Sequence, residues 1–360
     1  MAVQAQSYSA RLLSNPSSAK SCTMREARLS AAGDVSANCF FPRVTLAGIF
    51  VAINGGLAGQ TTSKAVVWRG TATSATTLSG SLTQPRSYSL GMLPDSSVLG
   101  YIGSNSNDDY KAATLSQWKG SSRSKYNLPT TYSSWLVEQI SRTGSSLLLT
   151  DSDTTFGPRF AVIRNGIATT LPPLPQACGT VRQDFQTQSW RVNDNGQVAL
   201  LFEQDLSYTP PYNNSEPYVH TACLWTGINW TVSPARSTEY AMELLDVSSN
   251  GTMMLRQLDN TLEWHAQGQV QTIDSKVRGY GDQDMWLGGS SPNSGQTGAP
   301  ASLWRNGQQV DLTQISTAPA GYTLGTAIDS NAKGQVLVLA KATKAGATTG
   351  DIRLVLLTPR

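Results

Sequence analysis

The segment APASLWRNGQQVDL (Ala299–Leu312) contains a phrase that returns elsewhere in the chain: an aliphatic residue, a tryptophan and then a turn with glycine. The same order of residues occurs in KAVVWRG (Lys64–Gly70) and in TACLWTG (Thr221–Gly227). After each turn, polar and apolar residues alternate over a few positions, which predicts a half-buried β-strand. The phrase therefore predicts two strands joined by a short turn.

A second phrase also repeats: an apolar residue, then Asn, Asp or Ser, two or three turn residues, a glycine and a hydrophobic strand. It occurs in SWRVNDNGQVALLF (Ser189–Phe202), MELLDVSSNGTMMLR (Met242–Arg256) and LVEQISRTGSSLLLT (Leu136–Thr150). Glycine suits such a turn because it adopts φ > 0 without steric cost. Each match predicts an antiparallel pair of strands.

Together the two phrases make a unit of four antiparallel strands, repeated about seven times at a spacing of about 50 residues. Units of this kind predict an all-β, single-domain β-propeller over residues 1–360. The expected blades are approximately 22–85, 86–130, 131–175, 178–234, 237–275, 277–316 and 320–360. Six or eight blades stay open as alternatives, because Val44–Gly59 could add a hairpin to the first blade. The repeated tryptophans are expected to pack between blades (Trp68, Trp118, Trp225 and Trp304).

The two ends of the chain predict how the propeller closes. The last unit stops after a third strand, IRLVLLTP (Ile352–Pro359), while a lone strand over residues 5–14 precedes the first complete unit. Pairing the two would remove exposed sheet edges. We expect Ser7–Leu13 to pair with Ile352–Leu357.

The chain has four cysteines, which allow three full pairings. Their spacing favours Cys22–Cys39, which flank one β-turn, and leaves Cys178–Cys223; four free thiols are the alternative. Two disulfides would imply an oxidising compartment, so the protein is expected to be secreted or periplasmic. The N-terminal sequence MAVQAQSYSA has neither the basic start nor the apolar core of a signal peptide.

Several of these phrases resemble one known family, the extracellular bacterial repeat proteins named for a His-Ala-Phe tripeptide. The matching phrases are AIDSNAKGQVLVLA, RVNDNGQVALL, TACLWTG and PASLWRNGQQVDL. The His-Ala-Phe position itself is occupied by other residues here, as in Thr221-Ala222-Cys223. The resemblance implies a secreted propeller and brings no catalytic residues with it.

The best candidate for a contact site is the irregular loop EQDLSYTPPYNNSEPYVH (Glu203–His220). Tyrosine offers a large amphipathic contact area at little entropic cost, and proline restricts the loop before binding. We expect Tyr208, Tyr212, Glu216 and Tyr218 to contact a protein or glycan ligand. The alternative is a loop that packs on its own blade.

Pairs of carboxylates mark three other loops (Asp108 and Asp109, Asp151 and Asp153, Asp282 and Asp284). Of these, Asp151 and Asp153 join the predicted ligand-binding residues. Two acids across a pocket could serve glycoside hydrolysis, and an Asp-x-Asp pair could bind Ca²⁺. No metal site or cofactor is otherwise predicted, because the two histidines stand in unrelated phrases and no phosphate-binding glycine loop is present.

The composition of the chain argues against some classes of ligand. Charged residues make up 14% of the chain and the net charge of +3 is spread along it, which argues against a nucleic-acid ligand. No stretch is long and apolar enough to span a bilayer. The sequence favours a non-enzymatic binding or interaction module. The alternatives are a polysaccharide-acting hydrolase or lyase and a structural component of a surface assembly; oligomeric state and ligand identity stay open.

Overall fold

The computed structural model describes residues 7–19, 21–42, 61–78, 80, 86–103, 113–151, 159–178, 186–207, 215, 217–258, 260–265, 268–290, 300–305, 307–344 and 351–360. Within these residues the strands form seven antiparallel sheets, and the other regular elements are three short 3₁₀ turns. The protein is therefore an all-β, seven-bladed propeller, as the repeat predicted. The proposed extra hairpin at Val44–Gly59 lies outside the described residues.

The chain divides into two compact units. The first unit comprises Met1–Asn127, Gly289–Leu303 and Gly307–Arg360. One of its sheets contains β2 (Ser21–Leu29), β3 (Val35–Pro42), β4 (Thr61–Trp68) and β5 (Thr76–Leu78), and a second contains β6 (Arg86–Met92), β7 (Val98–Gly103), β8 (Thr114–Lys119) and β9 (Ser122–Lys125). A third has the order β1 (Tyr8–Leu13), β29 (Ile352–Pro359), β28 (Val336–Ala342) and β27 (Tyr322–Ser330).

The second unit comprises Leu128–Gly288 and Trp304–Asn306. After η2 (Thr130–Tyr132), its first sheet contains β10 (Leu136–Ile140), β11 (Ser146–Asp151), β12 (Arg159–Arg164) and β13 (Ile167–Thr170). After η3 (Gln176–Cys178), a sheet of five strands contains β14 (Gln186–Val192), β15 (Val198–Asp205), β16 (Tyr218–Trp225), β17 (Trp230–Val232) and β18 (Arg236–Thr238). The next contains β19 (Glu243–Val247), β20 (Met253–Gln257), β21 (Asn260–Trp264) and β22 (Val270–Ile273). The seventh sheet has the order β23 (Val277–Tyr280), β24 (Trp286–Gly288), β25 (Ser302–Arg305) and β26 (Gln308–Asp311), with η4 (Asp282–Asp284) between β23 and β24. Its strands β23 and β24 belong to the second unit and β26 belongs to the first.

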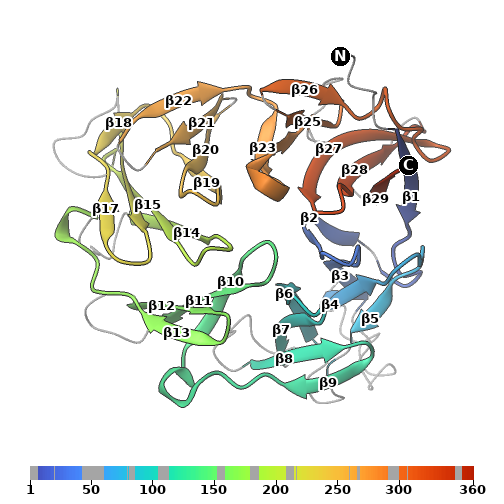
Figure 1. The fold of residues 1–360 in the computed structure, drawn as a ribbon, viewed down its shortest axis with the longest axis horizontal. Helices are drawn as coiled ribbons and strands as arrows, with labels where there is room; N and C mark the ends of the chain where they lie inside the picture. The colour runs from blue at the N-terminus through green and yellow to red at the C-terminus, as the bar shows by residue number, and fades with distance from the viewer. Residues whose placement is uncertain are drawn as a thin grey trace, which may run out of the picture. The chain divides into compact units, whose positions relative to one another are not determined.

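The N-terminal strand completes the last blade. β1 pairs antiparallel with β29 from Tyr8↔Pro359 to Leu13↔Leu354 (Figure 1). Tyr8 and Leu13 are 2% and 0% exposed, so both ends of β1 are anchored by buried side chains. The predicted closure by one N-terminal and three C-terminal strands is confirmed.

The repeated tryptophans are core residues. Trp68, Trp118, Trp225 and Trp304 are each at most 6% exposed. Trp118 on β8 packs in one cluster with Ala65 and Val67 of β4, which belong to the preceding sheet. Burial of such large apolar surfaces is the main favourable contribution to folding. The recurrence of the phrase thus reflects packing between consecutive sheets.

The second repeated phrase forms the turn between the first two strands of a sheet. In one form an asparagine caps the turn: the side-chain oxygen of Asn193 accepts the amide hydrogen of Gln197 at 2.9 Å, and Asn331 does the same for Gln335 at 3.2 Å. In the other form a serine hydroxyl accepts it, as at Ser248, 2.9 Å from the amide of Thr252. These bonds explain why the phrase requires Asn or Ser five residues before the first residue of the strand.

Asparagine turns also reach the following sheet within each unit. Asn193 Nδ2 donates to the carbonyl of Ser248 at 2.7 Å, and Asn331 Nδ2 donates to the carbonyl of Ser30 at 2.9 Å. All four residues are buried. We call this pair of contacts the turn clamps. Each of these carbonyls also accepts the amide hydrogen of its own turn glycine, Gly251 or Gly33, so the clamp adds a second hydrogen bond to a buried acceptor.

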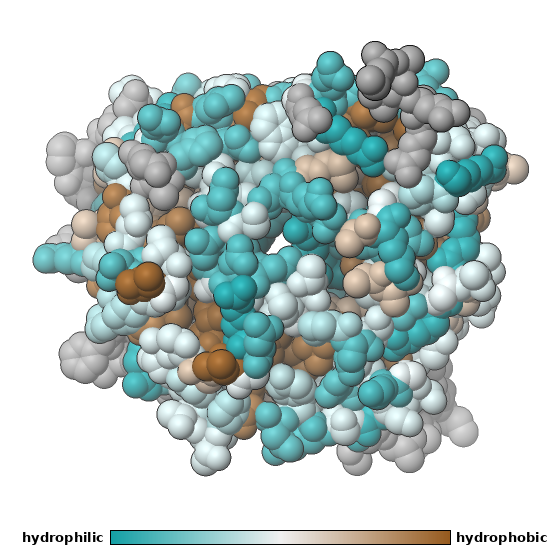
Figure 2. All heavy atoms as spheres, in the orientation of Figure 1, coloured by the Kyte–Doolittle hydropathy of each residue, from teal (hydrophilic) through white to brown (hydrophobic). Residues whose placement is uncertain are grey.

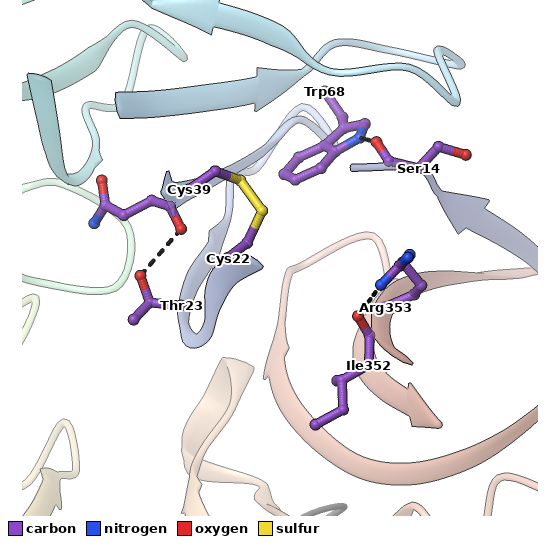
Figure 3. The surroundings of a disulfide bond; sticks show 8 residues. Ser14, Cys22, Thr23, Cys39, Trp68, Ile352 and Arg353 are labelled. Carbon is purple, nitrogen blue, oxygen red and sulfur yellow. Dashed lines mark hydrogen bonds between the residues drawn. A yellow bond between two sulfur atoms is a disulfide. The ribbon is translucent and has the colours of Figure 1, made fainter. Parts of the chain in front are cut away.

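Both predicted disulfides are present. Cys22 joins Cys39 across the β2–β3 pair (Figure 3), and Cys178 of η3 joins Cys223 of β16. Thr23, next to the first bridge, donates a hydrogen bond to the carbonyl of Asn38 at 3.0 Å. Two disulfides indicate an oxidising, extracytoplasmic compartment. In the part of the chain that the model describes, no helix has the length and hydropathy of a membrane span.

Candidate functional site

The predicted contact loop begins and ends on the long β15–β16 hairpin. These strands pair over eight residues, from Val198↔Trp225 to Asp205↔Tyr218. The amide of Leu206 donates to the carbonyl of Pro217, which closes the loop at its base. β18 adds a fifth strand along the same end of β16. The loop therefore starts from a rigid support, the arrangement in which loops commonly carry function.

Two of the six predicted ligand-binding residues lie within the described residues. Tyr208, Tyr212, Glu216 and Asp153 lie outside them, as do Asp108 and Asp109. Tyr218 begins β16 and stacks on His220, with ring centroids 6.3 Å apart and an angle of 21° between the rings. Asp151 ends β11, in a different sheet, where it forms an ion pair with Arg159. The guanidinium of Arg159 also lies over the ring of Trp135, 5.4 Å from its centroid.

His220 is a buried residue that sequence reasoning missed. It is 0% exposed, and its Nε2 lies 2.9 Å from the hydroxyl of Thr238. Its Nδ1 lies 3.6 Å from Oε2 of Glu203. Burial lowers the pKa of His220 below its ordinary value, and the Glu203 carboxylate opposes that shift. The only sequence signal was a histidine at the start of a strand otherwise rich in apolar residues.

An exposed apolar pair lies beside this cluster. Tyr240 is 40% exposed and Leu258 is 59% exposed. The carbonyl of Tyr240 accepts hydrogen bonds from Thr238 at 2.7 Å and from Gln257 at 3.3 Å, so it is tied to both β18 and the end of β20. Leu258 follows Gln257 at the tip of the β20–β21 hairpin. We call Tyr218, Tyr240, Gln257 and Leu258 the tyrosine–leucine surface.

Leu258 has an unusual backbone. Its φ of 50° lies in the left-handed region, which glycine, asparagine and aspartate adopt readily and leucine does not. For an L-residue with a bulky side chain this conformation costs roughly 1–2 kcal/mol. An apolar side chain is thus held in water on a strained turn, which no packing in the described residues explains. Exposed apolar residues presented in this way are typical of contact sites.

The described carboxylates outside this surface serve the fold. Asp246 Oδ2 accepts the amide of Tyr280 at 2.9 Å, and the Tyr280 hydroxyl donates to Glu263 at 2.7 Å. Burial, with the Glu263 carboxylate beside it, raises the pKa of Tyr280 well above its usual range. In η4, Asp284 accepts the amide of Ser249 at 2.7 Å. These acids accept hydrogen bonds from neighbouring sheets, and among the described residues no group of three or more His, Cys, Asp or Glu could hold a metal ion.

The face of the molecule shown in Figure 2 is covered mainly by hydrophilic residues, and hydrophobic residues reach it in separate places. Large exposed hydrophobic residues among those described are Ile167, Ile228, Tyr240 and Leu258, all in the second unit. Exposed hydrophobic residues that stand singly are normal on a protein surface, so exposure alone does not mark a site, and Leu258 is singled out by its left-handed backbone.

Comparison with known proteins finds distant likenesses among solved structures and no family. No family model and no curated protein matches the sequence. Among solved structures, the β-propeller domain of the Trilobed protease from Pyrococcus furiosus is similar, with a TM-score of 0.49 and 9% identity over 95% of this chain and 97% of that one. Uncomplexed Pyrococcus horikoshii acylaminoacyl peptidase has a TM-score of 0.49 and 10% identity, covering 96% of this chain and 53% of the peptidase.

A polysaccharide lyase, the PL25 ulvan lyase, matches with a TM-score of 0.40 and 10% identity over 91% of this chain and 77% of the lyase. The chain spans about half the length of the acylaminoacyl peptidase. At these identities and TM-scores the likenesses carry no conclusion about this chain. The resemblance to the His-Ala-Phe repeat proteins stays a prediction from the sequence.

Proposed function

We propose that the protein is a non-enzymatic binding module, secreted or periplasmic, that recognises a protein ligand through the tyrosine–leucine surface. The observation that carries the proposal is Leu258, which is 59% exposed with φ of 50° at a hairpin tip. An aliphatic side chain gains most from an apolar protein pocket, where its burial contributes roughly 1.5–3 kcal/mol. A glycan ligand would use the aromatic residues instead.

We add the loop between β15 and β16 to the proposed site on the basis of the sequence alone, with Tyr208, Tyr212 and Glu216 as expected contacts. Tyrosine is enriched at binding sites because its ring combines apolar area with a hydroxyl group. The hydrogen bond with Glu239 raises the pKa of the Tyr240 phenol, so the hydroxyl stays protonated at neutral pH. The hydrolase or lyase alternative stays a prediction from the sequence, since Asp108, Asp109 and Asp153 lie outside the described residues.

The test is a binding screen against extracellular proteins and glycans with wild type and Leu258→Asn. Asparagine tolerates a left-handed backbone, so the substitution removes the apolar contact without straining the turn. We expect protein ligands whose affinity falls at least about tenfold in the variant, the equivalent of 1.4 kcal/mol. Gln308→Asn, which changes an exposed residue on the hairpin of another sheet, is the control. Equal binding by wild type and Leu258→Asn contradicts the proposal, and glycan hits alone would transfer it to the tyrosines.

A second candidate function rests on another observation. The residue after the turn glycine between the third and fourth strands is Thr71, Ser121, Gln269 or Gln308 in four sheets, but isoleucine in two consecutive sheets of the second unit. These residues, Ile167 and Ile228, are 72% and 78% exposed. The replacement of polar residues by isoleucine favours a role in a surface assembly. Sedimentation of wild type and of a double variant with asparagine at both positions tests it: assembly that persists in the variant contradicts the idea.

A further inference from the structure

His220 is held on three sides by titratable or hydrogen-bonding groups. In register, Glu203 of β15 lies opposite it on one side and Arg236 of β18 on the other. Tyr218 stacks on its ring from the same strand. The side chain is fully buried, so its protonation state is set by these neighbours and not by bulk water.

The hydrogen bonds define which ring nitrogen carries the proton. The hydroxyl of Thr238 donates to the carbonyl of Tyr240 at 2.7 Å, so its hydrogen is already used. His220 Nε2, 2.9 Å from the same hydroxyl oxygen, must therefore be the donor in that contact. In the neutral ring this leaves Nδ1 without a proton, as an acceptor.

Nδ1 is buried and has no hydrogen-bond partner among the described residues. It faces Oε2 of Glu203 at 3.6 Å, so a lone pair points toward a carboxylate. The same oxygen accepts the amide hydrogen of Met242 at 2.9 Å. Glu203 thus already anchors the segment that carries Tyr240, and its carboxylate also lies where a proton-bearing Nδ1 could donate to it.

We propose that His220 and Glu203 form a proton-sensitive latch on the tyrosine–leucine surface, closed when His220 is neutral and opened when Nδ1 takes up a proton. Protonation turns Nδ1 into a donor, and a charged N–H···O bond has a length of roughly 2.7–2.9 Å. Shortening the 3.6 Å separation requires a movement of roughly 0.8 Å between the ring and Oε2, the oxygen that also accepts the Met242 amide. The segment that carries Tyr240 and Met242 then loses one of its anchors.

The latch deepens the proposed function, because it would regulate the same surface. Thr238 ends β18, Tyr240 and Met242 lie on the short segment that follows it, and the Tyr240 carbonyl is bonded to Gln257 next to Leu258. Loosening the segment changes the position of Tyr240 relative to Leu258. Acidification is therefore expected to release a ligand held by both residues.

The experiment follows His220 and Met242 without any ligand. The chain has two histidines, so imidazole nitrogen NMR gives two titrations that are assigned with His220→Gln and His265→Gln. Hydrogen exchange of the Met242 amide is measured across the same pH range, as a protection factor corrected for the intrinsic rate. We expect protection to fall as His220 is protonated, about tenfold for each unit by which its pKa in the closed state lies below that in the open state.

The variants separate the latch from a general loss of structure. Glutamine at position 220 keeps a donor near Nε2 but does not titrate, so Met242 protection should become independent of pH, while His265→Gln should behave as wild type. Glu203→Gln removes the charge that favours the protonated ring and should move the His220 titration to lower pH. Unchanged wild-type protection through the His220 titration, or an equal fall in His220→Gln, overturns the latch.

These outcomes are distinct from failure of the binding proposal. If no ligand is found in the screen but Met242 protection follows His220, the latch stands and the binding function fails. If a ligand binds through Leu258 with the same affinity on both sides of the His220 titration, the binding function stands and its regulation fails.

Discussion

Removing the two disulfides one at a time measures what each contributes to stability. Cys22–Cys39 closes a loop of 17 residues along the sequence and Cys178–Cys223 one of 45. In the chain-entropy treatment a cross-link stabilises by restricting the unfolded chain, which gives about 3 kcal/mol for the shorter loop and about 4 kcal/mol for the longer at 25 °C. Burial acts in the same direction, since Cys178 and Cys223 are both 0% exposed.

The assay is urea unfolding of the two paired Cys→Ala variants, followed by tryptophan fluorescence. With an unfolding entropy of about 2.1 cal/mol/K per residue over 360 residues, these losses lower Tm by roughly 4 °C and 5 °C. A larger loss for the Cys22–Cys39 variant than for the Cys178–Cys223 variant would refute the reasoning from loop length and burial. Without both bridges the summed loss of about 7 kcal/mol is comparable to the whole stability of an average protein, so the fold depends on an oxidising compartment.

Three further predictions concern closure, pH and one turn. Leu13→Ala should lower the free energy of unfolding in urea by about 2–5 kcal/mol, because the Leu13 side chain is 0% exposed. Leu12 is half-buried, so Leu12→Ala should lower it clearly less. Equal losses would contradict the closure geometry. The pKa of His220 in the folded state lies below its ordinary 6.5, so the unfolded chain binds the proton more readily. The free energy of unfolding is therefore at its full value above pH 6.5 and falls as pH drops through the folded pKa. His220→Gln should flatten this part of the plot of unfolding free energy against pH. Gly251→Ala should lower the free energy of unfolding by roughly 1–3 kcal/mol more than Gly227→Ala. Both glycines have a left-handed φ, but only at Gly251 would the added methyl group lie 2.5 Å from a neighbouring leucine. Similar melting temperatures for the two variants would disprove the clash.

The sequence contained most of the fold because the fold is repetitive. The tryptophan phrase at Trp118 and Trp225 marks a packing position that every sheet needs, so its recurrence revealed the sheets before any contact was known. Turn glycines such as Gly251 have positive φ for the reason predicted. Closure by β1 could be predicted because the last unit lacks its fourth strand and the chain begins with a strand that belongs to no other unit.

The candidate site was less predictable because it departs from the repeat. β18 (Arg236–Thr238) is a fifth strand with no counterpart in the repeated phrases, and it creates the contact between His220 and Thr238. Leu258 occupies a short hairpin turn where the sequence reads QLDN, without the glycine that marks the other turns. Neither His220 nor Leu258 belongs to a repeated phrase. The position of His220 opposite Glu203 depends on strand register, which a single sequence does not define.

The turn clamps give the order of the blades a direction. In both, an asparagine turn is followed by a serine turn that supplies only its carbonyl, as Asn193 is followed by Ser248 and Asn331 by Ser30. Because the acceptor in each clamp is a main-chain carbonyl, which every residue has, the clamp requires an asparagine in the first blade and no particular side chain in the second. Recombination that replaces the second blade should therefore keep the contact, whereas replacement of the asparagine blade should remove it.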